Sequence, residues 1–216
     1  MSTKLEIWNN ALLELGDRRL TDTGEPGDAS ETLAGIYNSV VRDCLEEASW
    51  NFAMVTTKVL GDTGIVYTDT GGSIFGYRYG FVKPDGWMRT HAVSGDEYFV
   101  APLTAFEDEG GQWYADTTPI YVRFTDTGTG IAPANWTRRF TRFVELELAV
   151  RSPRINQMSA AQRDMLEKRR DRAKSMAKSA DSMDGPQPKF RPEGSWNASR
   201  GMGGGGERGN RHKFTG

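Results

Sequence analysis

The fold is decided by the stretch LEIWNNALLELGDRRLTDTGEPGDASETLAGIYNSVVRDCLEEASWNFA, residues 5–53. Its first part carries apolar side chains at every third or fourth position: Leu5, Trp8, Leu12 and Leu15. This spacing predicts an amphipathic helix. Thr3 and Glu6 fit a capping box at the start of this helix. Gly16 is suited to end it, because glycine adopts the left-handed conformation easily.

A second amphipathic pattern follows a loop over residues 20–27 that is rich in glycine and acidic residues. Asp28 with Glu31 predicts the cap of this second helix. Apolar residues then keep helical spacing as far as Trp50: Leu33, Tyr37, Val40, Val41, Cys44, Leu45 and Ala48. Both helices are polar on their other face, so we predict an antiparallel helical hairpin. Cys44 lies on the apolar stripe and is interpreted as a core residue rather than a nucleophile.

Residues 61–130 lose the helical spacing. Aromatic and β-branched residues cluster between Gly, Asp and Thr, which is typical of short strands. We predict strands over residues 65–67, 75–82, 88–93, 98–101, 112–115 and 119–125. Turn sequences lie at residues 69–72, 84–86, 94–96 and 109–111. The pattern predicts an antiparallel sheet or small barrel inserted between two helical halves.

The chain returns to helical spacing over residues 135–150, and Ser152-Pro153 predicts the end of that helix. Ser159 with Gln162 predicts the cap of the last helix. Its apolar residues are Met165, Leu166, Ala173, Met176, Ala177 and Ala180. Its other face is basic, with Arg163, Lys168, Arg169, Arg170, Arg172, Lys174 and Lys178. We interpret this face as solvated or subunit-facing, with contact to DNA as the alternative.

The formal net charge of -2 conceals an uneven distribution. Residues 1–135 hold 9 Lys and Arg against 20 Asp and Glu, whereas residues 136–216 hold 18 against 9. One explanation is intramolecular: a basic helix lies beside an acidic one. The other is intermolecular: copies pack basic edge to acidic edge and close into a ring. The sequence leaves both explanations open.

No pattern of catalytic chemistry is found in the sequence. His91 lies in a predicted strand and His212 near the C-terminus, and neither has partners at metal-ligand spacing. Phosphate loops, nucleophile elbows and dinucleotide-binding fingerprints are not found. We therefore predict a protein that is not an enzyme and that uses no cofactor and no metal. No run of residues approaches the roughly 20 apolar residues that span a bilayer, so we predict no membrane partner.

Several segments together resemble the head-to-tail adaptors of short-tailed phages, the tail tubular protein A family. They are the helix that ends at Leu15-Gly16, the helix with Tyr37 and Leu45 that leads into Trp50-Asn51-Phe52-Ala53, the segment GFVKPDGWMR at 80–89, the strand IYVRF at 120–124 and the helix at 143–150. The resemblance extends over roughly residues 3–180. The glycine-rich residues 185–216 do not match the family pattern.

The resemblance implies an α+β structural protein of the virion. It would form a ring of about twelve copies at the head–tail junction after assembly in the host cytoplasm. The implied partners are further copies of the chain, the portal protein, the tail nozzle protein and transient nonspecific DNA in the channel. We expect a four-helix bundle from residues 1–60 and 132–184 and a β-rich insertion over 61–131. The alternative function is a nucleic-acid-binding module built on the basic helix.

Residues 185–216 have no periodicity and cannot bury enough apolar surface to order by themselves. They nevertheless carry spaced apolar and basic side chains, from which we predict that they order on the portal. The candidate portal-binding residues are Phe190, Arg191, Trp196, Arg200, Met202, Arg208, Arg211 and Phe214. The alternative is a disordered tail.

Overall fold

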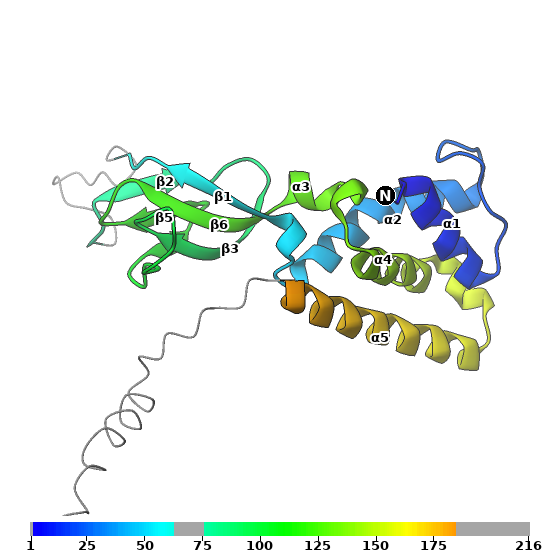
Figure 1. Ribbon diagram of the computed structural model, residues 1–216. Helices are drawn as coiled ribbons and strands as arrows, with labels where there is room; N and C mark the ends of the chain where they lie inside the picture. Colours follow the sequence, from blue (N-terminus) through cyan, green and yellow to red (C-terminus); the bar gives the residue numbers. More distant parts are fainter. Residues whose placement is uncertain (1, 63–75, 185–216) are drawn as a thin grey trace, which may run out of the picture. The chain divides into compact units, whose positions relative to one another are not determined.

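The computed structural model describes residues 2–62 and 76–184 of the 216-residue chain. This part of the chain has the predicted α+β fold, with a helical bundle and two small antiparallel sheets (Figure 1). The predicted strand at 65–67, the turn at 69–72 and all the candidate portal-binding residues of 185–216 lie outside the described residues.

Helix α1 (Lys4–Leu15) has the predicted boundaries. Thr3 accepts a hydrogen bond from the backbone N–H of Glu6, and the Glu6 carboxylate accepts one from the backbone N–H of Thr3, so the capping box is confirmed. Gly16 ends the helix in the left-handed conformation at φ 75°. The helix buries Ile7, Trp8, Ala11 and Leu12.

Helix α2 (Asp28–Glu46) differs from the prediction at both ends. The residue before its first turn is Gly27, which has no side chain to cap with, so the assignment of Asp28 as the cap was wrong. Asp28 and Glu31 instead lie in the first turn, where the helix dipole favours acidic side chains. The helix ends at Glu46 rather than near Trp50. The Trp50 indole N–H donates to the carbonyl of Cys44 at 2.8 Å and thereby satisfies one terminal acceptor.

The bundle is organised around helix α4 (Arg138–Arg151), which contacts α1, α2 and α5 (Ala160–Asp184). The predicted hairpin is therefore not held together mainly by direct packing of α1 on α2. These two helices touch through the rings of Trp8 and Tyr37, whose centroids lie 6.1 Å apart. The predicted end of α4 at Ser152-Pro153 and the Ser159–Gln162 cap of α5 are both confirmed.

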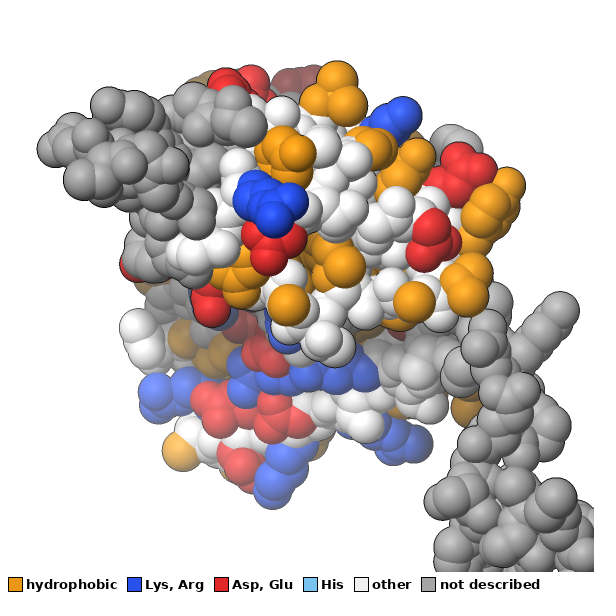
Figure 2. All heavy atoms as spheres, turned by 90° about the vertical axis from the view of Figure 1, so that its left-hand side faces the viewer, with side chains coloured by type: hydrophobic (Ala, Val, Ile, Leu, Met, Phe, Trp, Pro, Cys, Tyr) orange, Lys and Arg blue, Asp and Glu red, His pale blue; other side chains and the backbone are white. Residues whose placement is uncertain are grey.

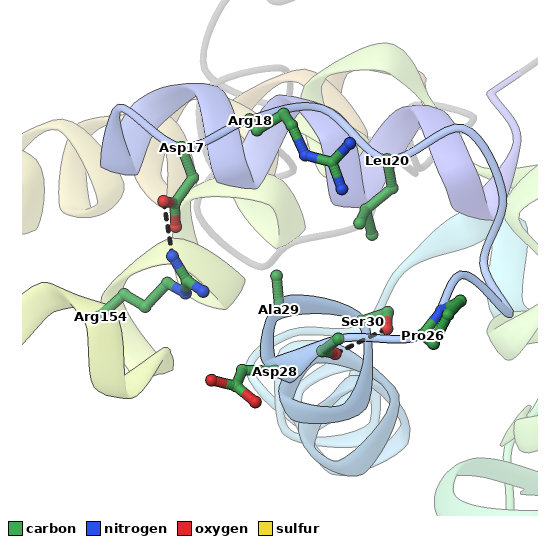
Figure 3. A pocket seen from close by; sticks show the side chains of 9 residues that line it. Asp17, Arg18, Leu20, Pro26, Asp28, Ala29, Ser30 and Arg154 are labelled. Atoms are coloured by element: carbon green, nitrogen blue, oxygen red, sulfur yellow. Dashed lines mark hydrogen bonds and ion pairs between the residues drawn. The ribbon is translucent and has the colours of Figure 1, made fainter.

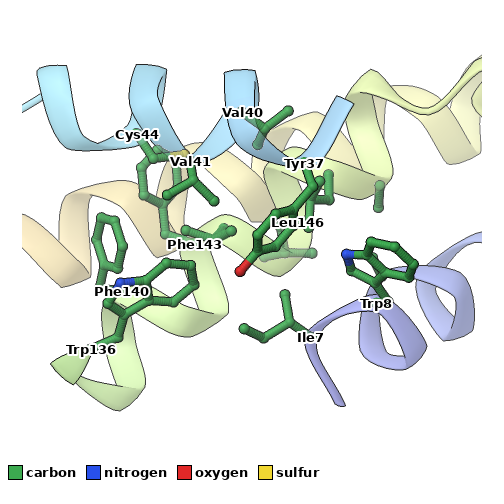
Figure 4. Packing of buried hydrophobic residues seen from close by; sticks show 14 of the residues in the cluster. Ile7, Trp8, Tyr37, Val40, Val41, Cys44, Trp136, Phe140, Phe143 and Leu146 are labelled. Atoms are coloured by element: carbon green, nitrogen blue, oxygen red, sulfur yellow. The ribbon is translucent and has the colours of Figure 1, made fainter. Parts of the chain in front are cut away.

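The core of the bundle is rich in aromatic side chains (Figure 4). The ring of Phe140 packs against Trp50, with centroids 4.8 Å apart, and against Trp136 at 5.1 Å. Cys44 is buried in this core as predicted, and burial raises the pKa of its thiol. Burial also raises the pKa of Tyr37 to about 12. The first two helices thus join the later helices in a single apolar core.

The β unit contains two three-stranded antiparallel sheets. The first has the order β1 (Met54–Val59), β6 (Ile120–Asp126), β3 (Trp87–Ser94), and the second has the order β2 (Tyr79–Val82), β5 (Gln112–Ala115), β4 (Glu107–Glu109). Both sheets contribute to one core of buried residues: Phe81, Val93, Trp113, Ala115, Ile120, Val122 and Phe124. Trp113, an aromatic residue of strand β5, is fully buried in this core.

Two strands and a short helix were not predicted. Strand β1 lies inside residues 1–60, which were expected to be helical, so the β-rich part begins near residue 54 rather than 61. Strand β4 is missed because it is a three-residue acidic edge strand, and charged edges carry little strand signal. Helix α3 (Thr127–Ile131) is short and glycine-rich, and it begins at the cap residue Asp126.

The predicted strand over residues 98–101 was wrong, because this segment is a loop. Phe99 has a φ of 54°, which no strand residue adopts. The strands predicted over 88–93, 112–115 and 119–125 match β3, β5 and β6 to within one residue at each end. The strand predicted over 75–82 matches β2 at its end, but β2 begins only at Tyr79. Gly86, at φ 85°, closes the turn between β2 and β3 as its sequence indicated.

Candidate interaction surfaces

Acidic side chains of α1, of α4 and of the residue that follows α2 form ion pairs with the basic helix α5. Glu14 on α1 binds Arg169 at 2.6 Å and Arg142 of α4 at 2.5 Å. Glu147 on α4 binds Arg170 at 3.0 Å and Arg151 at 2.6 Å. The carboxylates of Glu14 and Glu147 are only 12% and 8% exposed, so water screens these pairs less than fully exposed ones.

Glu47, the residue after α2, ties the C-terminal half of α5 to the bundle. Its carboxylate accepts hydrogen bonds from Lys174 at 2.5 Å and Lys178 at 3.2 Å. These bonds, that of Lys174 first, lower the pKa of Glu47. Further along α5, Asp181 accepts the backbone N–H of Asn51 at 3.0 Å, which fixes the helix to the segment that leads into β1. Helix α5 is therefore braced along most of its length.

The basic residues predicted to face DNA or another subunit fall into three groups. Arg169, Arg170, Lys174 and Lys178 bind carboxylates of other parts of the bundle. Lys168 pairs with Asp164 of its own helix. Arg163 makes no ion pair with the described residues, and its Nε atom is buried without a hydrogen-bond partner among them. Within the described residues, Arg172 makes no ion pair. Arg169, Lys174 and Lys178 pair with acids of residues 1–135, so the intramolecular explanation of the charge distribution accounts for three of the seven.

The β unit exposes several large apolar side chains: Leu60, Val82, Tyr98 and Val100. Figure 2 looks at the molecule from the side of the β unit and shows hydrophobic side chains spread over this face, with acidic side chains among them. Acidic residues outnumber basic ones in the described part of this unit. Exposed apolar side chains among charges are typical of the surfaces by which proteins bind one another.

The loop between Ser94 and Pro102 holds two of these side chains in a defined conformation. The carboxylate of Asp96 accepts the backbone N–H groups of Tyr98 at 2.9 Å and Val100 at 3.3 Å, and the hydroxyl of Ser94 at 2.8 Å. These hydrogen bonds, that of Ser94 first, lower the pKa of Asp96. The ring of Phe99 packs against the guanidinium of Arg123 at 4.6 Å. A loop fixed in this way loses little conformational entropy on binding.

A polar cluster links the two sheets of the β unit. The ammonium of Lys83 lies 3.4 Å from the ring centroid of Trp87 and pairs with the carboxylate of Asp108. Asp108 also accepts the hydroxyl of Thr90 at 2.7 Å and the indole N–H of Trp113 at 3.2 Å. The Lys83 side chain is 7% exposed, so its charge is compensated chiefly by Asp108. We interpret this cluster as a structural clamp.

His91 joins the β unit to the end of α2. Its Nδ1 lies 3.1 Å from the Ser49 hydroxyl and its Nε2 lies 2.7 Å from the Thr125 hydroxyl. Burial, with the charges of Arg89 and Arg123, lowers the pKa of His91. Among the residues that the structure describes, no carboxylate is hydrogen-bonded to the imidazole, so these residues do not supply the third member of a nucleophilic triad. Among residues 2–62 and 76–184, no group of three or more His, Cys, Asp or Glu side chains could hold a metal ion.

A cavity of about 150 Å³ lies where the loop after α1 meets the first turn of α2 (Figure 3). Asp17 pairs with Arg154 at 2.6 Å beside it, and Leu20, Ala29 and Ser30 complete much of its wall. The Ser30 hydroxyl donates to the carbonyl of Gly27 at 2.9 Å. Because Asp17 already neutralises Arg154, the cavity presents no strong net charge to a ligand, and we assign it no function.

The sequence matches no protein-family model and no curated protein. In the part of the chain that the structure covers, no helix is long and apolar enough to cross a membrane.

Two residues of α5 lie where the sequence analysis did not expect them. Met165 and Met176 were assigned to the apolar face that packs into the bundle, but both are exposed. The side chains that pack inwards are Leu166, Ala173 and Ala177. The surface loop with Tyr98 and Val100 was also missed, because its residues were interpreted as a strand. Its only sequence signal is Asp96 placed two residues before Tyr98, which is typical of an Asx turn.

Proposed function

We propose that this protein is a structural subunit of the head-to-tail connector of a short-tailed phage. Copies of the chain pack side by side as a ring between the portal and the tail nozzle, and the ring extends the DNA channel. The chain acts without a catalytic centre, and DNA is held by confinement rather than by base readout. The order of the helical and strand segments, which resembles that of tail tubular protein A, motivates this proposal.

The observation that carries the proposal is the bracing of α5. A helix built to bind phosphate groups would keep its cations free for them. Here Arg169, Arg170, Lys174 and Lys178 are engaged by acids of the same chain. Such a bundle is suited to serve as a rigid wall element, because ion pairs and a single apolar core fix all its long helices to one another.

A binding experiment on portal particles tests the proposal. The full-length chain is mixed with purified portal, and the particles are examined by negative-stain imaging and mass measurement. We expect a ring of this protein on the portal vertex, and monomers that never join the portal would contradict the proposal. Salt-sensitive DNA binding by the free monomer, without portal binding, would favour the nucleic-acid-binding alternative instead.

A deletion tests the role of residues 185–216 separately. The proposal includes these residues as the segment that grips the portal with its aromatic and basic side chains. Deleting residues 185–216 is expected to weaken portal binding while the described helices and strands stay folded, as measured by circular dichroism. Unchanged portal affinity would remove the tail from the proposal and leave the ring itself to be judged by imaging.

A further inference from the structure

One face of α5 points away from the bundle and carries three methionines. Met165, Met176 and Met183 are 60%, 44% and 78% exposed. Met165, the exposed cations Lys168 and Arg172, and Met176 follow one another at intervals of three or four residues. Met183 follows two helical turns after Met176, so all five side chains lie on one side of the helix. We call these five residues the methionine stripe. The opposite side of α5 packs into the bundle through Leu166, Ala173 and Ala177.

The display loop, residues 94–102, offers the opposite chemistry. Tyr98 is 78% exposed and Val100 is 62% exposed, and Asp96 fixes the backbone that carries both. Glu97 is exposed next to them and makes no ion pair within the described residues. The Glu97 carboxylate accepts the hydroxyl of Tyr98, which raises the pKa of that tyrosine. The loop therefore presents one aromatic, one aliphatic and one anionic side chain together.

We propose that the display loop of one copy docks on the methionine stripe of the next copy. Tyr98 and Val100 would pack among Met165, Met176 and Met183, and Glu97 would pair with Lys168 or Arg172. This inference rests on the proposed ring-forming function and names the contact between its subunits.

The chemistry of the two surfaces favours a second copy as the occupant. Methionine side chains adapt to the shape of a partner and make favourable contacts with aromatic rings such as that of Tyr98. The charges are complementary, since the loop is anionic and the stripe is cationic. The two surfaces are different, so the contact is head-to-tail and leaves one free loop and one free stripe after each addition. Contacts of this kind generate closed rings or filaments.

Variants that disable one surface each provide a sharp test. Tyr98→Ser with Val100→Ser removes the loop, and Met165→Ser with Met176→Ser removes the stripe. Either chain alone still retains one intact surface, so the two variants mixed together should form a dimer that cannot grow further. We expect each variant alone to associate at least about tenfold more weakly than the wild type in sedimentation velocity. Leu13→Ser, on α1, is the matched exposed control and should associate like the wild type.

Cross-linking covers the case in which association is weak. Tyr98→Cys in one chain and Met176→Cys in another, mixed and mildly oxidised, should give a disulfide-linked dimer. Leu13→Cys paired with Tyr98→Cys should not. Cys44 is buried, so it does not compete in this reaction. If neither the mixed serine variants nor the cysteine pair produces a dimer, the inference is overturned.

Two further outcomes show whether the subunit contact alone is wrong or whether another segment covers the methionine stripe. If the wild type forms rings on portal particles but the Tyr98 and Met176 cysteines do not cross-link there, the subunit contact is wrong and the proposed function stands. If a chain carrying Met176→Cys and Trp196→Cys cross-links within itself in preference to the Tyr98 partner, the stripe is covered by the chain's own C-terminal segment. That result would also overturn the inference.

Discussion

The helical bundle and the β unit use their acidic residues in different ways. In the bundle, Glu14, Glu47 and Glu147 reach across to basic residues on other helices, and two of them bind cations more than a hundred residues away in sequence. In the β unit, Asp96 and Asp126 accept backbone N–H groups within four residues of themselves and shape loops. The bundle is thus closed by long-range pairs, whereas the β unit depends more on local turn chemistry.

In the proposed ring, this difference would separate a wall element from a contact surface. Long-range pairs lock helices that are distant in the chain, and they leave few cations free on the bundle side of α5. Local capping leaves the tips of loops free to carry exposed side chains such as Tyr98 and Val100. Rigid scaffolds that present exposed loops are a common way to combine stability with binding.

The largest expected effect comes from the aromatic core of the bundle. Phe140→Ala should lower the free energy of unfolding by about 3–5 kcal/mol, because Phe140 is fully buried and its removal leaves a cavity among Trp50, Trp136 and Phe143. Urea denaturation followed by circular dichroism at helical wavelengths measures this loss. Leu13→Ala, at an exposed position of α1, should change the free energy by less than about 0.5 kcal/mol. A tolerated Phe140→Ala would mean that the bundle core is not shared by its helices.

A somewhat smaller loss is expected where the β unit does depend on a buried charge. Asp108→Asn should cost about 2–3 kcal/mol, because it leaves the Lys83 ammonium nearly buried without its carboxylate. Urea denaturation monitored by tryptophan fluorescence is suited to this region, since Trp87 and Trp113 lie in the cluster. Glu107→Gln is the control on the same strand, where the side chain is exposed. Equal effects of the two substitutions would contradict the assignment of Asp108 as a clamp.

The sequence predicted those features of the fold that are determined locally. The Thr3–Glu6 and Ser159–Gln162 caps, the stop at Gly16 and the turn at Gly86 each depend on a few neighbouring residues, and all are confirmed. The predicted boundaries of α2 were wrong where the local sequence allowed more than one helix end. Gly27 and Asp28 could both begin α2. Helical spacing continues past the end of α2 at Glu46, where the Trp50 indole N–H donates to the Cys44 carbonyl.

The candidate surfaces were predicted less well, for a physical reason. The apolar residues of α5 cover too wide an arc for all of them to contact α4. Periodicity reveals the arc, but the tertiary packing decides that Leu166 faces inwards and Met165 outwards. The uneven charge distribution between residues 1–135 and 136–216 indicated that basic and acidic segments pack together, within one chain or between copies. It could not indicate that Glu14 binds Arg169, because a pair 155 residues apart leaves no local signal.

The ion pairs of the bundle should give a moderate effect that depends on salt. Glu147→Gln is expected to lower the free energy of unfolding by about 1–2 kcal/mol, because Arg151 and Arg170 lose a largely buried anion while keeping partial access to water. Glu46→Gln, at an exposed position of α2, should have almost no effect. Denaturation at low and high salt checks the cause, since the difference between wild type and Glu147→Gln should shrink as salt rises. A salt-independent difference would point to packing rather than charge.

The smallest predicted effect is a difference between the bundle and the β unit in how their stability depends on pH. Burial raises the pKa of Asp181 in the bundle, so its contribution to stability is fully present below the unfolded pKa of about 3.9 and is lost as pH rises through the folded value. Asp108 in the β unit behaves in the opposite way. Burial opposes its ionisation, but hydrogen bonds led by Lys83 and Thr90 lower its pKa, so its contribution is present above about pH 3.9 and is lost as pH falls.

The corresponding substitutions should therefore have opposite slopes. As pH rises above about 3.9, the stability of Asp181→Asn relative to wild type is expected to rise. The stability of Asp108→Asn relative to wild type is expected to fall as pH rises towards about 3.9 and to stay level above it. Urea denaturation of the three proteins at several pH values measures both slopes in one series. Slopes of the same sign would show that the two carboxylates do not differ in the way their surroundings indicate. Burial would then not dominate the ionisation of Asp181, or hydrogen bonds would not dominate that of Asp108.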